Sequence, residues 1–269
     1  MSHPPKVDPA TVYADAFVDR FGVDGARDLA LIAPKIGLKI TEVDADAFEG
    51  ALRRIKGRMI GTIALSRSIT DPGRRRFTAA HELGHYLIPS HAEASSPCRP
   101  IDIERWDPSL HAREIEANRF AAAALMSRAS IADLFKGEPS FDAVERIVDR
   151  RGTSFTSSAY RYVQLSGERI AVVWSEGGQA KWARGSDELY RIVRLGPLAA
   201  ETLASRAFRN APVPDAFDRV DATAWLYDRN LREGATILEH SKVLGRYGVL
   251  TLLWIDEPIE RWREYGDED

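Results

Sequence analysis

Two histidines and a glutamate stand at a spacing that can do metal chemistry, in the segment His81-Glu82-Leu83-Gly84-His85. On an α-helix, residues i and i+4 lie one turn apart on one face, so both imidazoles can bind one zinc ion. Glu82 points away from that axis and can serve as a general base without being a ligand. By chance, this HExxH pattern would arise in only about one sequence in a hundred of this composition. We therefore predict a zinc-dependent hydrolytic site rather than two surface histidines.

A catalytic zinc site needs a third protein ligand and one open position for water. We expect Glu114 to be that ligand. It begins a helical face that continues through Asn118 to alanines and a leucine, and a carboxylate on such a face is costly unless it is paired or metal-bound. Asn118, one turn further on, can hydrogen-bond a ligand histidine.

Two alternatives for the third ligand stay open. Glu116 lies roughly 200° around the helix from Glu114, so only one of the two carboxylates can point at the metal. His91 stands six residues after the HExxH motif, where some metalloproteases have a third histidine. That geometry needs a turn with positive φ at position 88, and Ile88 followed by Pro89 disfavours it.

The elements that must position these residues follow from hydrophobic periodicity and turn residues. The zinc-binding helix is predicted from about Arg76 to Ile88, after a turn at Asp71-Pro72-Gly73, and the helix that carries Glu114 from about Leu110 to Ser127. Helices are also expected at Asp8 to Phe21 and Asp24 to Ile36, strands at Lys39 to Val43 and Met59 to Ser66, and a long polar loop at His91 to Ser109.

Composition shifts near residues 130 and 166 divide the chain into predicted segments 1–129, 130–165 and 166–269. The middle segment has two helical patterns around Gly152-Thr153-Ser154, a layout like a helix-turn-helix. Its charges nearly cancel, which disfavours DNA readout and favours a packing module. The last segment has two hairpin signals, at Ile170 to Ala183 and Thr236 to Ile255. We therefore expect an α+β protein with a C-terminal α+β domain of unknown role.

Composition limits the class of protein. A net charge of -3 removes the simplest case for non-specific nucleic-acid binding, although direct binding stays open. No apolar run approaches the roughly 20 residues of a membrane span, and the N-terminal segment has no signal-peptide core. The single cysteine, Cys98, fits a cytoplasmic location. We expect Cys98 to be a bystander, with contact to the zinc as the alternative.

The segments RRRFTAAHELGHYL and EIEANRFAAAALM resemble the ImmA/IrrE family of metallo-endopeptidases. Both motifs match well, over roughly residues 50 to 165, while the C-terminal hundred residues match weakly or not at all. One departure is Ser127, which stands where the family usually has proline.

This resemblance implies a zincin-like metallopeptidase domain of the gluzincin type, with a small sheet beside the HExxH helix. It implies one zinc ion per chain, held by His81, His85 and Glu114, with Glu82 as the base. Met59 to Ser66 would be the edge strand that binds substrate by β-augmentation. Similar proteins cleave helix-turn-helix transcriptional repressors in stress response or mobile-element regulation, so such a repressor is the expected partner.

Two functional hypotheses follow. The first is a zinc endopeptidase that acts on a protein substrate. The second is a non-catalytic, zinc-containing transcriptional regulator that acts by binding DNA or a partner. A closed site with four protein ligands would favour the second hypothesis, and an open position at the metal would favour the first.

Overall fold

A computed structural model describes residues 8–55, 57–92, 112–185, 189, 192–228, 231–245 and 248–257. The chain forms two compact units. The first unit comprises residues 1–134 and 145–158, and the second comprises residues 135–144 and 159–269. The predicted three-segment division of the chain stays a prediction. Most of the predicted long loop, residues 93–111 with Cys98, lies outside the described residues.

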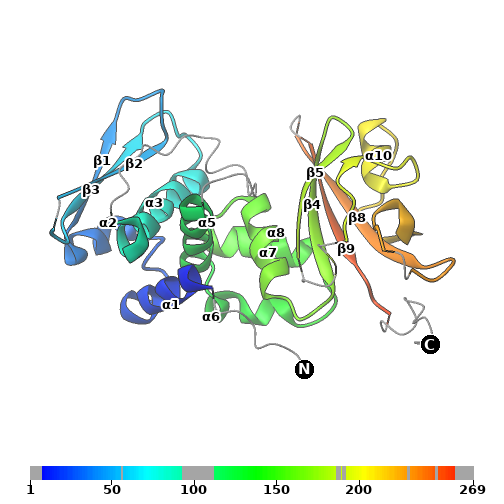
Figure 1. Cartoon of the computed structure of the whole chain (residues 1–269), viewed down its shortest axis with the longest axis horizontal. Coiled ribbons are helices and arrows are strands. Elements are labelled where there is room, and N and C mark those ends of the chain that lie inside the picture. Colours follow the sequence, from blue (N-terminus) through cyan, green and yellow to red (C-terminus); the bar gives the residue numbers. More distant parts are fainter. Residues whose placement is uncertain are drawn as a thin grey trace. The chain divides into compact units, whose positions relative to one another are not determined.

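The first unit contains a small sheet and the helices around it (Figure 1). Its longer helices are α1 (Pro9–Phe21), α3 (Pro72–Leu87) and α5 (Ala112–Leu125). Short helical turns are α2 (Leu29–Ile32), η1 (Ala33–Ile36), η2 (Pro89–His91), α6 (Arg128–Ile131) and η3 (Ala132–Phe135), the last of which ends at the first residue of the second unit. Helices α7 (Phe141–Arg151) and α8 (Phe155–Leu165) each contribute residues to both units.

The sheet of the first unit has three strands in the order β1-β3-β2. Strand β1 (Leu38–Val43) pairs in parallel with β3 (Gly61–Ser66), and β2 (Gly50–Arg54) pairs antiparallel with β3. The prediction that Met59 to Ser66 forms the edge strand is therefore wrong. Strand β3 is central, because β2, a strand that the sequence analysis did not predict, covers its second side. Strands β1 and β2 are the two edges of the sheet.

Helix α3 begins four residues earlier than predicted, at Pro72. The Asp71 side chain accepts a hydrogen bond from the Arg74 backbone N–H at 2.6 Å and caps the helix. Aspartate at the N-cap followed by proline at the first helical position is a strong start signal. The helix ends where Ile88 becomes extended, with φ -78° and ψ 116°, before Pro89.

Helix α3 lies between the sheet and α5: it contacts β2 and β3 on one side and α5 on the other. Helix α3 packs closely against both β2 and α5. A Cβ on Gly50 would lie 2.7 Å from Thr78 Cγ2, and a Cβ on Gly84 would lie 3.1 Å from the Phe120 ring. Helix α5 is buried from Phe120 to Leu125, so its alanines allow this tight packing. The motif helix is thereby fixed on both sides.

The three consecutive arginines before the motif anchor α3 to its surroundings. Arg74 pairs with Glu49 at 2.7 Å, Arg75 pairs with a glutamate of β1, and Arg76 donates to the Gly152 carbonyl oxygen at 2.8 Å. The run therefore acts locally, within the first unit.

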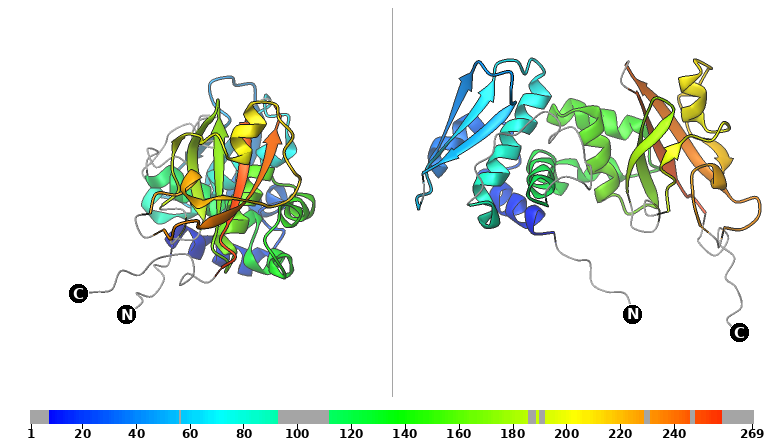
Figure 2. Two further views of the ribbon diagram at one scale, coloured as in Figure 1. Left: turned by 90° about the vertical axis from the view of Figure 1, so that its right-hand side faces the viewer. Right: turned by 45° about the horizontal axis from the view of Figure 1, so that its top comes forward.

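The second unit contains an antiparallel sheet of six strands in the order β6-β5-β4-β9-β8-β7. Its α10 (Leu203–Phe208) packs on β8 and β9 (Figure 2). Both predicted hairpins are confirmed, β4 with β5 and β8 with β9. The strands are β4 (Ile170–Glu176), β5 (Gln179–Gly185), β6 (Gly196–Pro197), β7 (Asp218–Asp221), β8 (Thr236–Leu244) and β9 (Gly248–Trp254), and η4 (Ala222–Ala224) is a further short turn.

The core of the second unit includes Trp225, which is 1% exposed and donates its indole N–H to Glu239 at 2.7 Å. Burial raises the pKa of the Glu239 carboxyl, against hydrogen bonds from Trp225, from backbone N–H groups at α10 and from Ser241. The predicted mixed α+β class is confirmed by these elements. Among the described residues, no helix combines the length and apolar character needed to cross a bilayer.

Replacing Gly50 by alanine should destabilise the first unit. The new Cβ would come within 3.0 Å of both Thr78 and Glu82, so β2 or α3 must shift. We expect the free energy of unfolding to fall by about 1–3 kcal/mol, measured by urea denaturation. Gly167→Ala is the matched control, because nothing lies near its Cβ position, and it should change stability by less than about 0.5 kcal/mol. Equal midpoints for the two variants would contradict this packing argument.

Candidate metal centre

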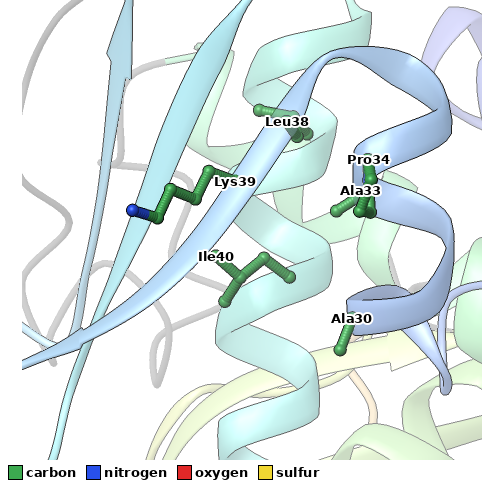
Figure 3. Close-up of a pocket in the computed structure, with 6 residues that line it drawn as sticks. All are labelled: Ala30, Ala33, Pro34, Leu38, Lys39 and Ile40. Atoms are coloured by element: carbon green, nitrogen blue, oxygen red, sulfur yellow. The ribbon is translucent and has the colours of Figure 1, made fainter.

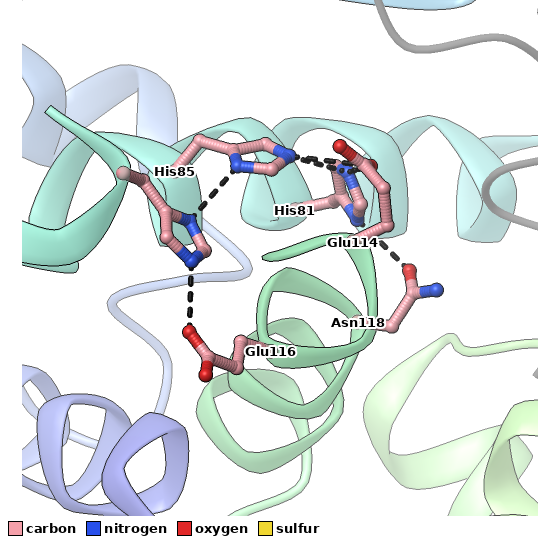
Figure 4. Close-up of polar contacts among 6 residues, drawn as sticks. His81, His85, Glu114, Glu116 and Asn118 are labelled. Carbon is pink, nitrogen blue, oxygen red and sulfur yellow. Dashed lines mark hydrogen bonds and ion pairs between the residues drawn. The ribbon is translucent and has the colours of Figure 1, made fainter. Parts of the chain in front are cut away.

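Three side chains from two helices meet at one point in the first unit (Figure 4). His81 and His85 come from successive turns of α3, and Glu114 comes from the first turn of α5. Glu114 Oε2 lies 3.1 Å from His81 Nε2 and 3.3 Å from His85 Nε2, and the two Nε2 atoms lie 3.1 Å apart. The three residues predicted as metal ligands are thus brought together.

The spacing of these three atoms suits a metal ion. In a tetrahedral centre with metal–ligand distances of about 2.0–2.1 Å, neighbouring ligand atoms are about 3.3 Å apart. The donor set, two imidazole nitrogens and one carboxylate oxygen, also suits a borderline divalent metal. Without a shared cation or proton, these lone pairs would repel one another at this distance.

Asn118 sets the orientation of the His81 ring. The Asn118 amide oxygen lies 2.8 Å from His81 Nδ1, and both side chains are fully buried. When Nδ1–H donates to this oxygen, the neutral ring presents a bare lone pair at Nε2, as a metal ligand must. The predicted contact between Asn118 and a ligand histidine is therefore present.

Glu114 stays ionised in this environment. Burial by itself would raise its pKa, but hydrogen bonds and electrostatic attraction from His81 and His85 outweigh burial and hold the pKa well below its usual range. A carboxylate with a low pKa competes weakly for protons and is available to a cation.

Glu82 is the most deeply buried carboxyl at the site, with 1% exposure. Its Oε1 has no hydrogen-bond partner among the described residues. Burial raises the pKa of Glu82 to about 8, with a lowering contribution from His85 and a further raising one from Glu114. A buried carboxyl with an unused oxygen beside a ligand cluster is placed as a proton acceptor would be.

The two alternative third ligands, His91 and Glu116, contact each other and lie outside the cluster of converging ligand atoms. His91 Nε2 lies 2.9 Å from Glu116 Oε2, and His91 Nδ1 lies 3.0 Å from His85 Nδ1. His91 thus contacts the Nδ1 atom of His85, whereas Glu114 contacts the Nε2 atom of the same ring. Burial lowers the pKa of His91, against the hydrogen bond that His91 donates to Glu116. Sequence analysis considered both residues only as ligands and missed this arrangement.

Other residues with suitable chemistry lie elsewhere. Tyr160, Tyr162, His111 and His240 have side chains of a type that could stabilise an oxyanion. His111 is outside the described residues, and the other three belong to the second unit. There His240 packs against the rings of Phe141 and Phe217.

A hollow in the surface of the first unit is separate from the cluster (Figure 3). It lies between the α2–η1 segment and β1. Apart from Lys39, its lining is apolar and offers no metal-binding side chain. The residues that line it are Ala30, Ala33, Pro34, Leu38, Lys39 and Ile40.

Comparison with known protein families matches residues 33–162 to Peptidase_M78, described as the IrrE N-terminal-like domain. Residues 33–162 resemble the Peptidase_M78 domain. The resemblance of the two motifs to ImmA/IrrE proteins is thereby confirmed. A comparison with curated proteins gives no match.

The Peptidase_M78 domain covers the three-stranded sheet, α3 and α5, and therefore every residue of the ligand cluster. It ends within α8, so most of the second unit lies outside it. The family supports a peptidase, and the His81, His85 and Glu114 cluster is compatible with a metal.

Removing the carboxylate of Glu114 should abolish metal binding. Glu114→Ala leaves two imidazoles, too few for a stable site, whereas His91→Ala leaves all three converging atoms in place. We expect about one metal ion per chain for the parent and for His91→Ala at saturating metal, and almost none for Glu114→Ala. Elemental analysis after gel filtration measures this. The reverse result would make His91 the third ligand.

The raised pKa of Glu82 predicts a pH-dependent stability of the metal-free chain. The folded-state pKa of about 8 exceeds the ordinary glutamate value of 4.5, so the folded chain holds the extra proton between these values. The free energy of unfolding should therefore fall as pH rises through this window, by up to about 1.4 kcal/mol per pH unit.

Glu82→Gln should remove this contribution, because glutamine does not titrate. The measurement is urea unfolding of parent and variant with a chelator present, between about pH 5 and pH 8. Groups common to both proteins cancel in the difference between the two curves. Parallel curves would show that Glu82 titrates normally.

Proposed function

We propose that this protein is a zinc-dependent endopeptidase that cleaves an intracellular protein substrate. The convergence of His81, His85 and Glu114 within one tetrahedral spacing carries the proposal. Two imidazoles and one carboxylate are the ligands of a well-known class of catalytic zinc sites with an open fourth position. In this assignment the domain is zincin-like and binds one zinc ion per chain.

Glu82 is the general base of the proposed reaction. When bound, zinc supplies Lewis acidity and lowers the pKa of water at the open position. Glu82 takes the proton of the attacking water and later gives it to the leaving amine. Burial fits the side chain for this role, because it makes the ionised carboxylate more basic, while the positive charge of a bound zinc ion would favour the ionised form.

The substrate is proposed to bind as an added strand along β2. This strand is one of the two edges of the sheet, and it is paired with β3 on its other side. Its first residue, Gly50, is so close to the base that a Cβ there would lie 2.8 Å from Glu82 Oε1. An extended peptide on this edge would obtain main-chain hydrogen bonds next to the base.

The resemblance to ImmA/IrrE proteins supports a proposal for the substrate class. We propose a helix-turn-helix transcriptional repressor, cleaved in the cytoplasm during stress response or mobile-element regulation, as in similar proteins. Residues 130–165, a segment with a helix-turn-helix layout, are proposed to be a packing module.

Three of the four arginines of that segment support a packing role over direct DNA readout. Arg150 forms a bidentate pair with Asp133, at 2.6 and 2.9 Å. Arg151 is 4% exposed and donates to the Leu125 carbonyl oxygen and to Asp24. Arg161, which is 2% exposed, donates to Gln164. Charges engaged in this way are poorly available to phosphates.

Glu82→Gln should stop cleavage and leave metal binding intact. Glutamine keeps the shape of glutamate but cannot accept the proton, so we expect cleavage to fall by about 10²–10⁴-fold. The assay incubates the zinc-loaded chain with purified helix-turn-helix repressors from the same genome, one at a time, and identifies fragments by mass spectrometry.

Glu138→Gln is the control, because Glu138 is an exposed glutamate outside the cluster, and it should cleave like the parent. Cleavage by Glu82→Gln at the parent rate would rule out the assigned mechanism. If the parent binds zinc and cleaves none of the repressors, the proposed substrate class is wrong.

A further inference from the structure

Behind the ligand cluster, three side chains form a hydrogen-bonded chain that ends on a ligand. Glu116 Oε2 contacts His91 Nε2 at 2.9 Å, and His91 Nδ1 contacts His85 Nδ1 at 3.0 Å (Figure 4). His91 is fully buried, while the side chain of Glu116 is 32% exposed. His85 Nε2, at the other side of its ring, lies at the ligand cluster.

The proton positions in these three hydrogen-bonded side chains depend on one another. A neutral imidazole carries one N–H, and a carboxylate can only accept. Because Glu116 accepts from Nε2–H of His91, Nδ1 of His91 has a lone pair. The short contact between the two Nδ1 atoms then requires that His85 donates its Nδ1–H to His91. His85 is left with a bare lone pair at Nε2.

That lone pair is the one a metal requires. In the opposite arrangement, with His91 donating to His85, the Nε2 atom of His85 would carry a proton aimed at Glu114 and could not bind a cation. His81 has its own partner in Asn118, so each ligand histidine has a side chain that selects the same tautomer.

We propose that Glu116 and His91 are positioning residues that act together to hold His85 in the tautomer and ring orientation that bind the metal. The proposal rests on the metal centre of the proposed function. It adds two residues that touch neither the metal nor the substrate, and it explains why a second glutamate follows Glu114 on α5.

The test compares two substitutions of His91 in the full-length chain. His91→Asn keeps an acceptor oxygen near the place of Nδ1, whereas His91→Phe keeps a ring of similar size and removes the acceptor. We expect His91→Phe to bind zinc about 10–100-fold more weakly than the parent, and His91→Asn within about 5-fold, by competition with a chromophoric chelator.

A spectroscopic measurement separates positioning from packing. In the zinc-loaded chain, the Nδ1–H proton of His85 should give a slowly exchanging NMR signal in the parent and in His91→Asn, and should exchange rapidly in His91→Phe. Parent-like zinc affinity of His91→Phe would overturn the proposal. Equal weakening in both variants would assign His91 a packing role only, which also overturns it.

If the two His91 variants do not fold, two substitutions of Glu116 provide an independent test. Glu116→Gln keeps an acceptor for Nε2–H, and Glu116→Leu does not. We expect zinc affinity to fall several-fold in Glu116→Leu and to stay close to the parent in Glu116→Gln. Unchanged affinity and an unchanged His85 signal in Glu116→Leu would overturn the proposal.

Failure of this inference is distinguishable from failure of the proposed function. If the parent chain binds no metal, the proposed function fails. If the parent binds zinc and cleaves a substrate but the His91 and Glu116 variants keep full zinc affinity, only the proposed positioning role of His91 and Glu116 is wrong.

Discussion

The structure of the first unit depends on one electrostatic constraint: three lone-pair atoms must lie about 3 Å apart without repelling one another. His81, His85 and Glu114 meet this condition only with a cation or a shared proton between them. Helix geometry brings the two histidines together without any tertiary contact, because they stand four residues apart on one helix. The carboxylate must come from a second helix, and this requires α5 to pack closely on α3, which the glycine at position 84 allows.

The two histidines of the cluster are oriented by hydrogen bonds on the side of each ring that faces away from the cluster. Asn118 behind His81 and the His91–Glu116 pair behind His85 are buried or partly buried, so their hydrogen bonds compete little with water. Glu82 differs from these residues because one of its oxygens has no partner among the described residues. Burial raises the pKa of Glu82, and a more basic carboxylate fits the proposed role of general base.

Local sequence signals predicted most helices and both hairpins of the second unit, because apolar periodicity and turn residues act over a few positions. They failed at β2. The segment Gly50–Arg54 begins with glycine and ends in two arginines, a composition that does not indicate a strand, and only pairing with β3 makes it one. The start of α3 was also missed, because Asp71-Pro72-Gly73 is equally a turn signal and an N-cap signal.

Residue spacing alone predicted a metal-binding chemistry: His81 and His85 stand one helical turn apart, Glu82 lies between them, and an acid stands on a helix with an apolar face. These inferences use spacing within one helix, which the chain fixes locally. How the remaining residues are used depends on tertiary packing. Whether His91 and Glu116 serve as ligands or as supports depends on where α5 meets the end of α3, and no local pattern encodes the distance between two helices. The edge strand was decided in the same way, since a strand becomes an edge through its neighbours in the sheet and not through its own residues.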